Sequence, residues 1–386
     1  MSQVLVDQFR KEFFLDSPSH IALNNAGTSL LTRKAFDKLK KVSEALAFEG
    51  AFILPLFAER DKAKETLAQF LNAKVSEVAW VQNCSAALSM VAQGYEEKRD
   101  EEIVILENEY PANFYPWIER SKRNHSQLRI VPVEKNLTRV EEKIVSQINP
   151  RTRIVALSHI QSDCGFKVDV QAIAEAAHKV GAIVVLDVIQ SMGIEAIDFQ
   201  KIGADIICGG SHKWLCGPIG AGFMVAKENL LEKITPCLHG ANNYGTFEDA
   251  SCVTRTPFQD SRRFEQGTVS FHSILGTAAS LEVLRDYNVD NLGKKALSLR
   301  NYLVEQLSEL GFHVYGSSKA TGPQVSVSHP KIKIHELSNA LNKEKISHAL
   351  RPAPVQEQKI LRLSPHAYNT KDEIAFAVET LKKVLA

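Results

Sequence analysis

The chain has 386 residues, of which 44% are hydrophobic and 24% charged, and its 46 Lys and Arg against 45 Asp and Glu give a net charge of +1. This composition is typical of a globular protein, and it excludes a fibrous chain, an acidic tail and a strongly basic nucleic-acid surface. No apolar run approaches the length of a membrane span, and charges interrupt the N-terminal segment MSQVLVDQFRKEFFLD, so we expect neither a membrane anchor nor a secretory signal.

From about residue 32 to residue 225, helical and short apolar segments alternate. Residues 32–48 and 57–71 have the three-four spacing of amphipathic helices, and residues 169–181 predict a crossover helix that ends at a glycine. The predicted strands are nearly continuous apolar runs, typical of strands buried on both faces: EVAWVQ, EEIVIL, LRIVPV, RIVALS, AIVVLD, DIICGG and GAGFMV. We therefore predict an α/β fold, with helices covering a mainly parallel seven-stranded sheet.

After about residue 254 the pattern changes. Two long helical stretches, residues 273–288 and 291–310, are followed by short strands (FHVYG, QVSVS and KILRLS) and by two further helices. This pattern predicts a smaller α+β C-terminal domain. We expect a large domain over residues 20–255 and a small one over residues 256–386, with residues 1–19 packing on the small domain.

The cysteines are six in number and scattered along the chain, without a CxxC pair. Such usage favours reduced thiols and a cytoplasmic location over a disulfide framework. No Cys/His cluster has metal-ligand spacing, so we expect no metal site.

A lysine and an aspartate are the first candidates for chemistry. Lys213 lies in a Gly-rich, nearly uncharged segment between two predicted strands. A lysine is most often a solvated surface charge, but apolar surroundings destabilise the ammonium and favour the neutral amine that forms a Schiff base. Asp187 ends a buried strand, at the edge where α/β sheets bind ligands. It is either a helix N-cap or a carboxylate that keeps a heteroaromatic nitrogen protonated, and Gln190 is placed to bond a ring hydroxyl.

Three further segments each have a structural and a functional interpretation. Ser85 precedes a small-residue helix, where it either caps the helix or, with free amides, binds phosphate. The aromatic turn ENEYPANFYPW serves packing or stacks on a planar ring. Arg362 lies inside a short apolar strand, where an unpaired cation is costly. It forms either a structural salt bridge or a bidentate site for a ligand carboxylate.

Taken together and in this order, these segments resemble the fold-type I pyridoxal-phosphate (PLP) enzymes, specifically the class V aminotransferase and cysteine desulfurase family. The strongest similarity is that of ADIICGGSHKWLCGPIGAGF to the lysine signature of the family, and the resemblance extends from NNAGTSLL to RLSPHAYNT. It implies PLP as the cofactor, an amino acid or related amine as the substrate and transamination as the leading reaction. A lyase or an epimerase would use the same residues.

The resemblance also implies roles around the cofactor. Lys213 matches the Schiff-base lysine, Asp187 the partner of the pyridinium nitrogen and Gln190 the residue near the phenolic oxygen. Tyr110 is the candidate for the place of the family's ring-stacking histidine. The residues expected to bind the phosphate are Cys84, Ser85, His212 and, as a substitute for a family serine, Ser211.

Other matches concern the substrate and the second subunit. Arg362 matches the arginine that receives the substrate α-carboxylate, with Arg351 at the other end of the same loop and with Asn25 and Gly27 lining the substrate side. The segment RRFEQGT resembles one that family dimers insert into the partner's site, which places Gly267 and Thr268 near the other subunit's phosphate. A homodimer with shared active sites is therefore expected.

One departure from the family bears on the reaction. Cysteine desulfurases carry a catalytic cysteine on the loop between two arginines, whereas the corresponding loop here, from Arg351 to Arg362, contains no cysteine. We therefore do not expect desulfurase action by the usual persulfide route. A non-catalytic PLP-binding regulatory protein on the same scaffold is the alternative of another class, but the matches at Lys213, Asp187 and Arg362 favour an enzyme, and the neutral charge balance gives no basis for nucleic-acid binding.

Overall fold

A seven-stranded sheet forms the centre of the protein, seen here in a computed structural model that describes residues 3–15, 20–50, 54–96, 98, 100–133, 137–245, 256–316, 321–353 and 356–385. Its strands lie in the order β2 (Val78–Val81), β8 (Gly222–Ala226), β7 (Ile206–Gly210), β6 (Ile183–Asp187), β5 (Thr152–Ser158), β3 (Glu102–Leu106) and β4 (Gln127–Val131). Only β8 runs antiparallel to its neighbours, β2 and β7. The predicted mainly parallel sheet is thus confirmed, with each of the seven predicted segments forming one strand.

Helices cover both faces of this sheet, which explains why its strands are continuous apolar runs. Successive side chains of a strand point to opposite faces, so Val184 and Leu186 of β6 enter one core cluster while Ile183 and Val185 enter the other. One face is covered by α4 (Cys84–Gly94), α5 (Tyr115–Asn124) and α8 (Glu228–Leu231). The other is covered by α3 (Leu54–Leu71), α6 (Val140–Gln147), α7 (Val170–Lys179) and α9 (Phe271–Asp286), with α2 (Arg33–Phe48) packed on α9.

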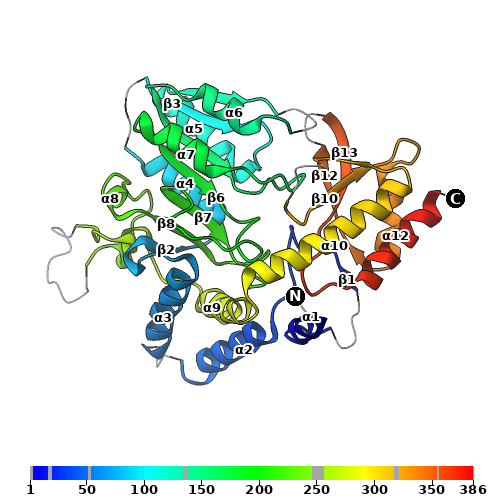
Figure 1. The fold of residues 1–386 in the computed structure, drawn as a ribbon. Coiled ribbons are helices and arrows are strands. Elements are labelled where there is room, and N and C mark those ends of the chain that lie inside the picture. The colour runs from blue at the N-terminus through cyan, green and yellow to red at the C-terminus, as the bar shows by residue number, and fades with distance from the viewer. Residues whose placement is uncertain are drawn as a thin grey trace.

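A smaller antiparallel sheet lies beside the large one, to the right in Figure 1. Its strand order is β12 (Ala349–Ala353), β13 (Gln356–Leu363), β10 (Val325–Ser328) and β9 (His313–Val314). Three of these strands were predicted. The fourth, β12, was not, because Pro352 lies within it and proline lacks the N–H that a ladder uses. The helices that share a core with this sheet are α10 (Val289–Glu309), α11 (Ile334–Lys343) and α12 (Lys371–Leu385).

The N-terminal segment contacts both units, since Phe9 and Phe13 enter the core of the large sheet while the residues after them pair with the small domain. Residues of β1 (Ile21–Ala22) pair in parallel with β11 (Ile346–Ser347), and Leu23 enters the core of the small domain. Before them, α1 (Gln3–Lys11) is fixed by Arg10, which donates to the Tyr368 carbonyl at 2.7 Å and pairs with Glu373 of α12 at 2.7 Å. These contacts bring the start of the chain next to its last helix (Figure 1).

The domain boundary at 255/256 stays a prediction, since residues 246–255 lie outside the described residues. Helix α9 follows this position, yet it buries Ile274 and Leu281 in the core of the large sheet. Helix α10 begins in that core with Leu292 and enters the core of the small sheet with Leu299. It therefore spans both units, as its long diagonal course in Figure 1 shows.

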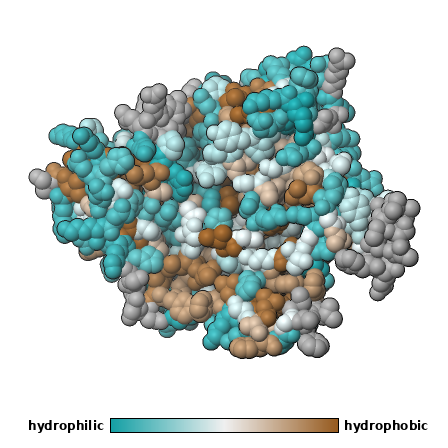
Figure 2. Space-filling view, turned by 180° about the vertical axis from the view of Figure 1, so that it is seen from behind, coloured by the Kyte–Doolittle hydropathy of each residue, from teal (hydrophilic) through white to brown (hydrophobic). Residues whose placement is uncertain are grey.

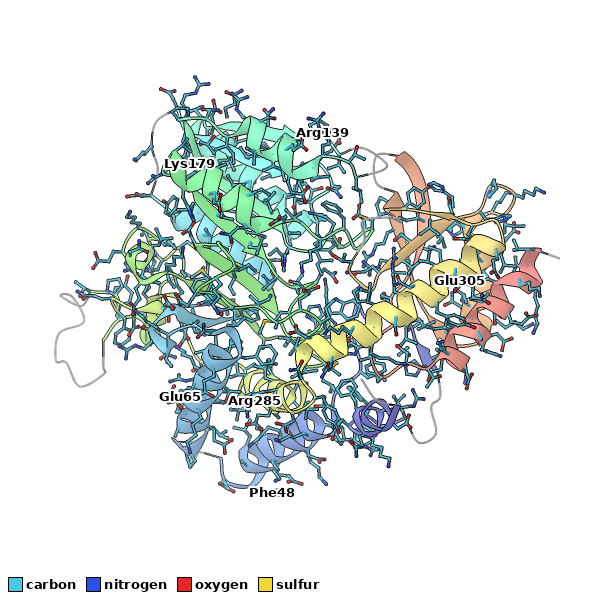
Figure 3. The ribbon with its side chains drawn as sticks, in the orientation of Figure 1. Phe48, Glu65, Arg139, Lys179, Arg285 and Glu305 are labelled. Atoms are coloured by element: carbon cyan, nitrogen blue, oxygen red, sulfur yellow. The ribbon has the colours of Figure 1, made fainter. Side chains whose placement is uncertain are left out.

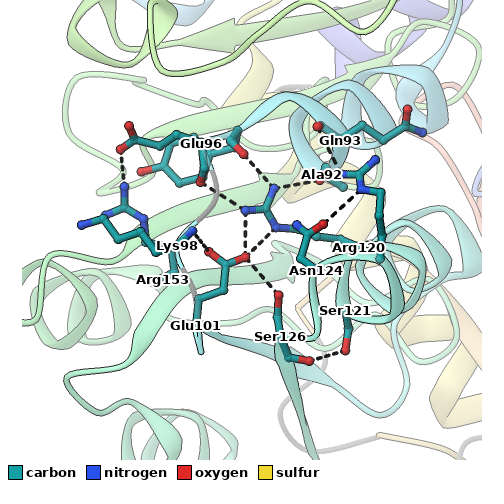
Figure 4. Close-up of polar contacts among 12 residues, drawn as sticks. Ala92, Gln93, Glu96, Lys98, Glu101, Arg120, Ser121, Asn124, Ser126 and Arg153 are labelled. Atoms are coloured by element: carbon teal, nitrogen blue, oxygen red, sulfur yellow. Dashed lines mark hydrogen bonds and ion pairs between the residues drawn. The ribbon is translucent and has the colours of Figure 1, made fainter.

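A buried ion pair connects α5 to the residue that directly precedes β3 of the large sheet. The Arg120 guanidinium lies 2.8 Å from the carboxylate of Glu101, and both side chains are at most 1% exposed. Arg120 also donates to the carbonyls of Ala92 and Tyr95, at 2.9 Å each (Figure 4). This arginine is therefore fully engaged by its own chain, which makes it a useful reference for a second buried arginine described below.

The molecular surface is mixed in character. On the face opposite to that of Figure 1, apolar side chains gather in the lower half, among polar ones (Figure 2). The most exposed large hydrophobic side chain of the described residues is Phe48, 85% exposed at the end of α2 (Figure 3). Among the helices described, none has the length together with the apolar character that crossing a bilayer requires.

Candidate active site

The candidate residues meet at the carboxyl ends of the parallel strands. Asp187 is the last residue of β6, and it is in register with Ser158 of β5 and Cys208 of β7. It is 3% exposed. Its Oδ1 accepts hydrogen bonds from the backbone N–H of Ile189 at 2.9 Å and from the Cys84 thiol at 3.3 Å. Its Oδ2 has no partner among the described residues and so remains available to a ligand.

Lys213 lies in the turn that follows β7 and is 8% exposed. Burial lowers its pKa from 10.5 to about 8, although the nearby Asp187 carboxylate acts in the opposite direction. Within the described part of the chain, no carboxylate lies within ion-pair distance of its ammonium. Lys213 is thus a buried amine whose neutral form is accessible near neutral pH, as the surrounding sequence predicted.

An aromatic ring faces this amine. The Nζ atom of Lys213 lies 5.4 Å from the centre of the Tyr110 ring, which is 38% exposed. Tyr110 precedes the 3₁₀ turn η2 (Pro111–Asn113), and the residue before it, Glu109, is buried. The Glu109 carboxylate accepts hydrogen bonds from the Ser158 N–H at 2.8 Å and from the Gln161 side chain at 2.9 Å. Glu109 therefore fixes the turn that carries Tyr110 against the end of β5.

The start of α4 differs from the predicted capping. Asn83, not Ser85, is the N-cap, and its Oδ1 accepts the Ala86 N–H at 2.8 Å. Ser85 is left exposed, and together with Tyr110 it lines a cavity of about 770 Å³ between α4 and α5. Asp187 and Lys213 do not line this cavity. Cys84 is buried, and burial raises its pKa well above the ordinary value of a thiol.

Two of the expected cofactor contacts, Gln190 and Ser211, are largely engaged within the chain. The Gln190 amide donates to the Ala26 carbonyl at 3.1 Å and accepts from Trp214 at 2.8 Å, so one N–H remains for a ligand. The Ser211 hydroxyl contacts the carbonyl oxygens of Pro218 and Ala221. Because its one proton is shared between these two oxygens, a phosphate would have to be met by another group of this turn.

The neighbouring His212 is half-buried. Burial and the adjacent Lys213 lower its pKa to about 4. At neutral pH the imidazole is therefore uncharged, and it is available as a hydrogen-bond donor through one ring nitrogen. Its role as a phosphate ligand stays a prediction.

Arg362 of β13 is 1% exposed and reaches from the small sheet toward the large one. Its guanidinium donates to the Ser162 carbonyl at 2.7 Å and to the Asn24 side-chain oxygen at 3.4 Å, whereas its Nε is buried without a partner. No carboxylate of the described residues forms an ion pair with it, so the structural salt bridge that the sequence left open is absent from them. Burial lowers the pKa of Arg362 from 12.5 to about 9.

The N-terminal segment contributes a different residue from the one expected. The Asn25 side chain donates to the carbonyls of Ala22, at 3.1 Å, and Ser364, at 2.8 Å, and it accepts the Tyr368 hydroxyl. It is therefore fully used in holding its own segment, while Asn24 reaches Arg362. A side chain at Gly27 would come within 2.8 Å of the Asn24 amide, so the glycine leaves room for Asn24.

The segment expected to reach a second subunit lies beside β2, an edge strand of the large sheet. It is anchored by Glu265, which pairs with Lys64 at 2.7 Å and accepts the Trp80 N–H at 2.9 Å. Gly267 and Thr268 follow this anchor and line a cavity of about 120 Å³ beside residues of β2. Thr268 is exposed. Whether the segment serves a partner's site stays a prediction.

Comparison with known proteins establishes the family. The family model described as "Aminotransferase class-V" matches residues 21–376. The chain belongs to the class-V aminotransferase family. A probable cysteine desulfurase of Methanothermobacter thermautotrophicus is 27% identical over 382 residues, which cover 95% of this chain and 94% of that protein.

Solved structures share the fold of this class-V family member throughout. The cysteine desulfurase CsdA of Escherichia coli has a TM-score of 0.89 at 24% identity and covers 98% of both chains. The cystine C–S lyase C-DES, in complex with its product cysteine persulfide, has a TM-score of 0.87 at 20% identity over 95% of this chain and 98% of its own. A C-DES variant with glycine linked to PLP has a TM-score of 0.89 at 19% identity over 96% of this chain and 98% of its own.

PLP is accordingly the cofactor of this class-V family member, and the residues present fit it. Lys213 and Arg362 are two buried cations without a carboxylate partner in the described chain, and an anionic group bound beside them would supply the charge that they lack. Asp187 has a free oxygen, and the Tyr110 ring faces the amine. Among the described residues there is no cluster of ligands suited to a metal ion.

Sequence reasoning did not single out two residues of this class-V site, Asn24 and Glu109. Asn24 forms an isolated parallel bridge with Ser364, directly after β13, and this pairing sets which of the two adjacent asparagines turns toward Arg362. A charged residue between a predicted strand and an aromatic turn was the only signal for Glu109. Its partners come from β5 and the loop beyond it, which the sequence does not place next to it.

Proposed function

We propose that this class-V family protein is a PLP-dependent enzyme that acts on an α-amino acid, with transamination as its reaction. The observation that carries the proposal is a pair of buried cations, one after β7 of the large sheet and the other in β13 of the small sheet. Lys213 lies near Asp187 and Tyr110 with its pKa lowered to about 8, and Arg362 extends from the small sheet toward the same loops.

Each of these residues has a distinct part in such a reaction. When bound, PLP supplies an electron-withdrawing ring that stabilises negative charge at the substrate Cα. The Asp187 carboxylate would hold the proton on the ring nitrogen, Tyr110 would cover the ring and Ser85 and His212 would hold the phosphate. Lys213 is the amine that would bond the cofactor aldehyde and, when released, the base that moves the α-proton. Arg362 would fix the substrate carboxylate and thereby the orientation of the bonds at Cα.

Cleavage of a Cβ–S bond in a sulfur amino acid is the second candidate, because relatives of this chain are named cysteine desulfurases. The protonation state of the cysteine thiols decides whether one of them can accept the sulfur that such cleavage releases. Burial raises the pKa of Cys84, Cys164, Cys208 and Cys216, and it also raises that of the half-buried Cys237. None of these described thiols is a thiolate near neutral pH, so none of them is suited to accept the sulfur as a persulfide, whereas Cys252 lies outside the described residues. The described thiols therefore favour release of the sulfur as sulfide.

A product analysis tests both reactions. The holoenzyme is incubated with a panel of amino acids, with and without a 2-oxo acid acceptor, and 2-oxo acid, ammonia and sulfide are measured separately. Transamination predicts a 2-oxo acid that requires the acceptor and forms without ammonia. Ammonia and sulfide in the absence of an acceptor favour the lyase, whereas no reaction across the panel by a protein with PLP bound at Lys213 favours a non-catalytic regulatory protein.

We further propose that the enzyme is a cytoplasmic homodimer with shared sites. This proposal is supported by two exposed residues, Ser85 and Thr268, and by the cavity of about 770 Å³ that Ser85 lines. The described cysteines are free, which supports a reducing compartment. Sedimentation analysis is expected to show a dimer, and a monomer that retains full activity would contradict the shared site.

A further inference from the structure

A second arginine of the small sheet has no hydrogen-bond or ion-pair partner among the described residues. Arg351 lies in β12 and is half-buried. Its Nε is shielded from solvent without a hydrogen-bond partner, and the described residues provide neither an ion pair nor a hydrogen bond to the rest of its guanidinium. An arginine that loses water in this way without a partner is costly, so it is expected to serve a ligand.

The register of the sheet places Arg351 next to Arg362. In the antiparallel pair of β12 and β13, Ala349 is opposite Arg362 and Arg351 is opposite Ile360. Opposite residues share a face, and so do residues two apart in one strand. Arg351 and Arg362 are therefore diagonal neighbours on one face of the small sheet.

This face is turned toward the loop that follows β5. Ser326 of β10, opposite Arg362 in register, bonds the Asp163 carbonyl, while Arg362 bonds the Ser162 carbonyl at 2.7 Å. Both arginines lower the pKa of Lys213, and Arg351 lowers that of Arg362. The positive charges of both guanidiniums thus act on the amine that the proposed reaction uses.

Asp163 acts favourably on Arg362, but no carboxylate of the described residues forms an ion pair with either guanidinium. Asp163 is the carboxylate closest in sequence to the Arg362 contact, and its oxygens accept from the Cys164 N–H at 2.8 Å and the Asn108 amide at 3.3 Å. Burial raises the pKa of Asp163, which weakens it further as a counter-ion. Asp187 lies near Lys213, and its Oδ1 is engaged by Cys84 and Ile189. A substrate α-carboxylate bound through two parallel N–H groups of Arg362 would leave the Arg351 guanidinium for a second anionic group.

We propose that the substrate is an α-amino acid with a second carboxylate on its side chain, with Arg362 binding the α-carboxylate and Arg351 the second one. This inference rests on the proposed function and adds the substrate class to it. A planar guanidinium matches a carboxylate through two parallel N–H groups, and two guanidiniums on one sheet face present two such sites at a fixed spacing.

Binding and turnover by Arg351→Gln test this assignment. In the holoenzyme, calorimetry measures Kd for succinate, a dicarboxylate without an amine, and for butyrate, which has one carboxylate. Succinate is expected to bind more tightly than butyrate to the wild type and to lose about 10- to 100-fold in the variant, with butyrate changed less than about twofold. For turnover, kcat/KM should fall similarly for aspartate or glutamate and little for asparagine or glutamine.

Control variants separate this effect from a general loss. Arg285→Gln removes an exposed arginine at the end of α9, on the lower side of Figure 3 and away from the small sheet, and it should change neither ligand. Arg351→Lys keeps the charge without the bidentate geometry and is expected to recover part of the succinate affinity. If Arg351→Gln does not fold, this lysine variant carries the test, since it should weaken succinate more than butyrate.

Two results would overturn the inference. Equal losses of succinate and butyrate in the Arg351 variants would show that both arginines hold one carboxylate, and a wild-type preference for neutral amino acids would exclude a diacid substrate. The proposed function fails differently. In that case no amino acid reacts, although succinate binding can still depend on Arg351.

Discussion

Replacement of Arg362 by methionine separates a ligand-binding arginine from a structural one, because Arg120 provides a matched comparison. Both side chains are at most 1% exposed. Arg120 is paired with Glu101 at 2.8 Å, whereas Arg362 has only the Ser162 carbonyl and the Asn24 amide oxygen. Removal of one partner from a buried ion pair costs about 3–5 kcal/mol, so Arg120→Met should lower the free energy of unfolding by that amount.

Arg362→Met should behave in the opposite way. Burial lowers the pKa of Arg362 from 12.5 to about 9, and at ~1.4 kcal/mol for each pKa unit the charged guanidinium destabilises the fold by an amount on the order of 5 kcal/mol. The hydrogen bonds that the variant loses contribute roughly 1.5–3 kcal/mol. Methionine retains most of the apolar packing. The free energy of unfolding should therefore rise by ~2–3 kcal/mol.

Urea unfolding of the apoprotein, without PLP or substrate, measures both variants. Enzyme kinetics complete the comparison: Arg362→Met should raise KM for α-amino acids by roughly 10- to 100-fold, from the loss of a charge-assisted contact, whereas folded Arg120→Met should keep its KM. If Arg362→Met destabilises the protein as much as Arg120→Met and leaves KM unchanged, Arg362 is a structural residue and the assignment of the substrate site is wrong.

Three further predictions follow from the surroundings of Lys213 and Asp187. Since the neutral amine reacts with the aldehyde and burial lowers the pKa of Lys213 to about 8, PLP incorporation into the apoprotein should speed up as pH rises to about 8 and then level off; a rate that keeps rising toward the ordinary lysine pKa of 10.5 would contradict this. Asp187→Asn should still take up PLP but should react with amino acids roughly 10- to 1000-fold more slowly, because an adjacent carboxylate favours the charged ring nitrogen by about 1–3 pKa units; wild-type rates in the variant would remove Asp187 from the cofactor. Iodoacetamide at neutral pH should leave Cys84, Cys208 and Cys216 unmodified in the native protein, as mass spectrometry of the peptides would show, and rapid labelling of any of them would reopen the persulfide route.

The architecture was predictable from sequence because its signals are local. Seven apolar runs gave seven strands, and the helix patterns at 32–48 and 291–310 correspond to α2 and α10 within two residues at each end. Strand β12 was missed because it contains Pro352, and proline is unfavourable within a strand. In each successful case the side chains of one segment report which faces are buried, and this is information that a single sequence contains.

The site was predictable only in part. Lys213 and Asp187 stand out because strand ends at the same sheet edge converge, whichever helices connect them. Which neighbour completes the site depends on long-range register. The bridge between Asn24 and Ser364 turns Asn24 toward Arg362 and uses Asn25 elsewhere, while Asn83 takes over the capping that Ser85 was expected to provide. Adjacent residues of the same type cannot be told apart without that register.

Reduction with borohydride followed by peptide mapping tests the central claim most directly. The protein is loaded with PLP and reduced, and the lysine that carries the phosphopyridoxyl group is located by mass spectrometry. The account predicts a single modified residue, Lys213, and no modification in Lys213→Ala. Modification of another lysine, or a protein that binds no PLP, would contradict it.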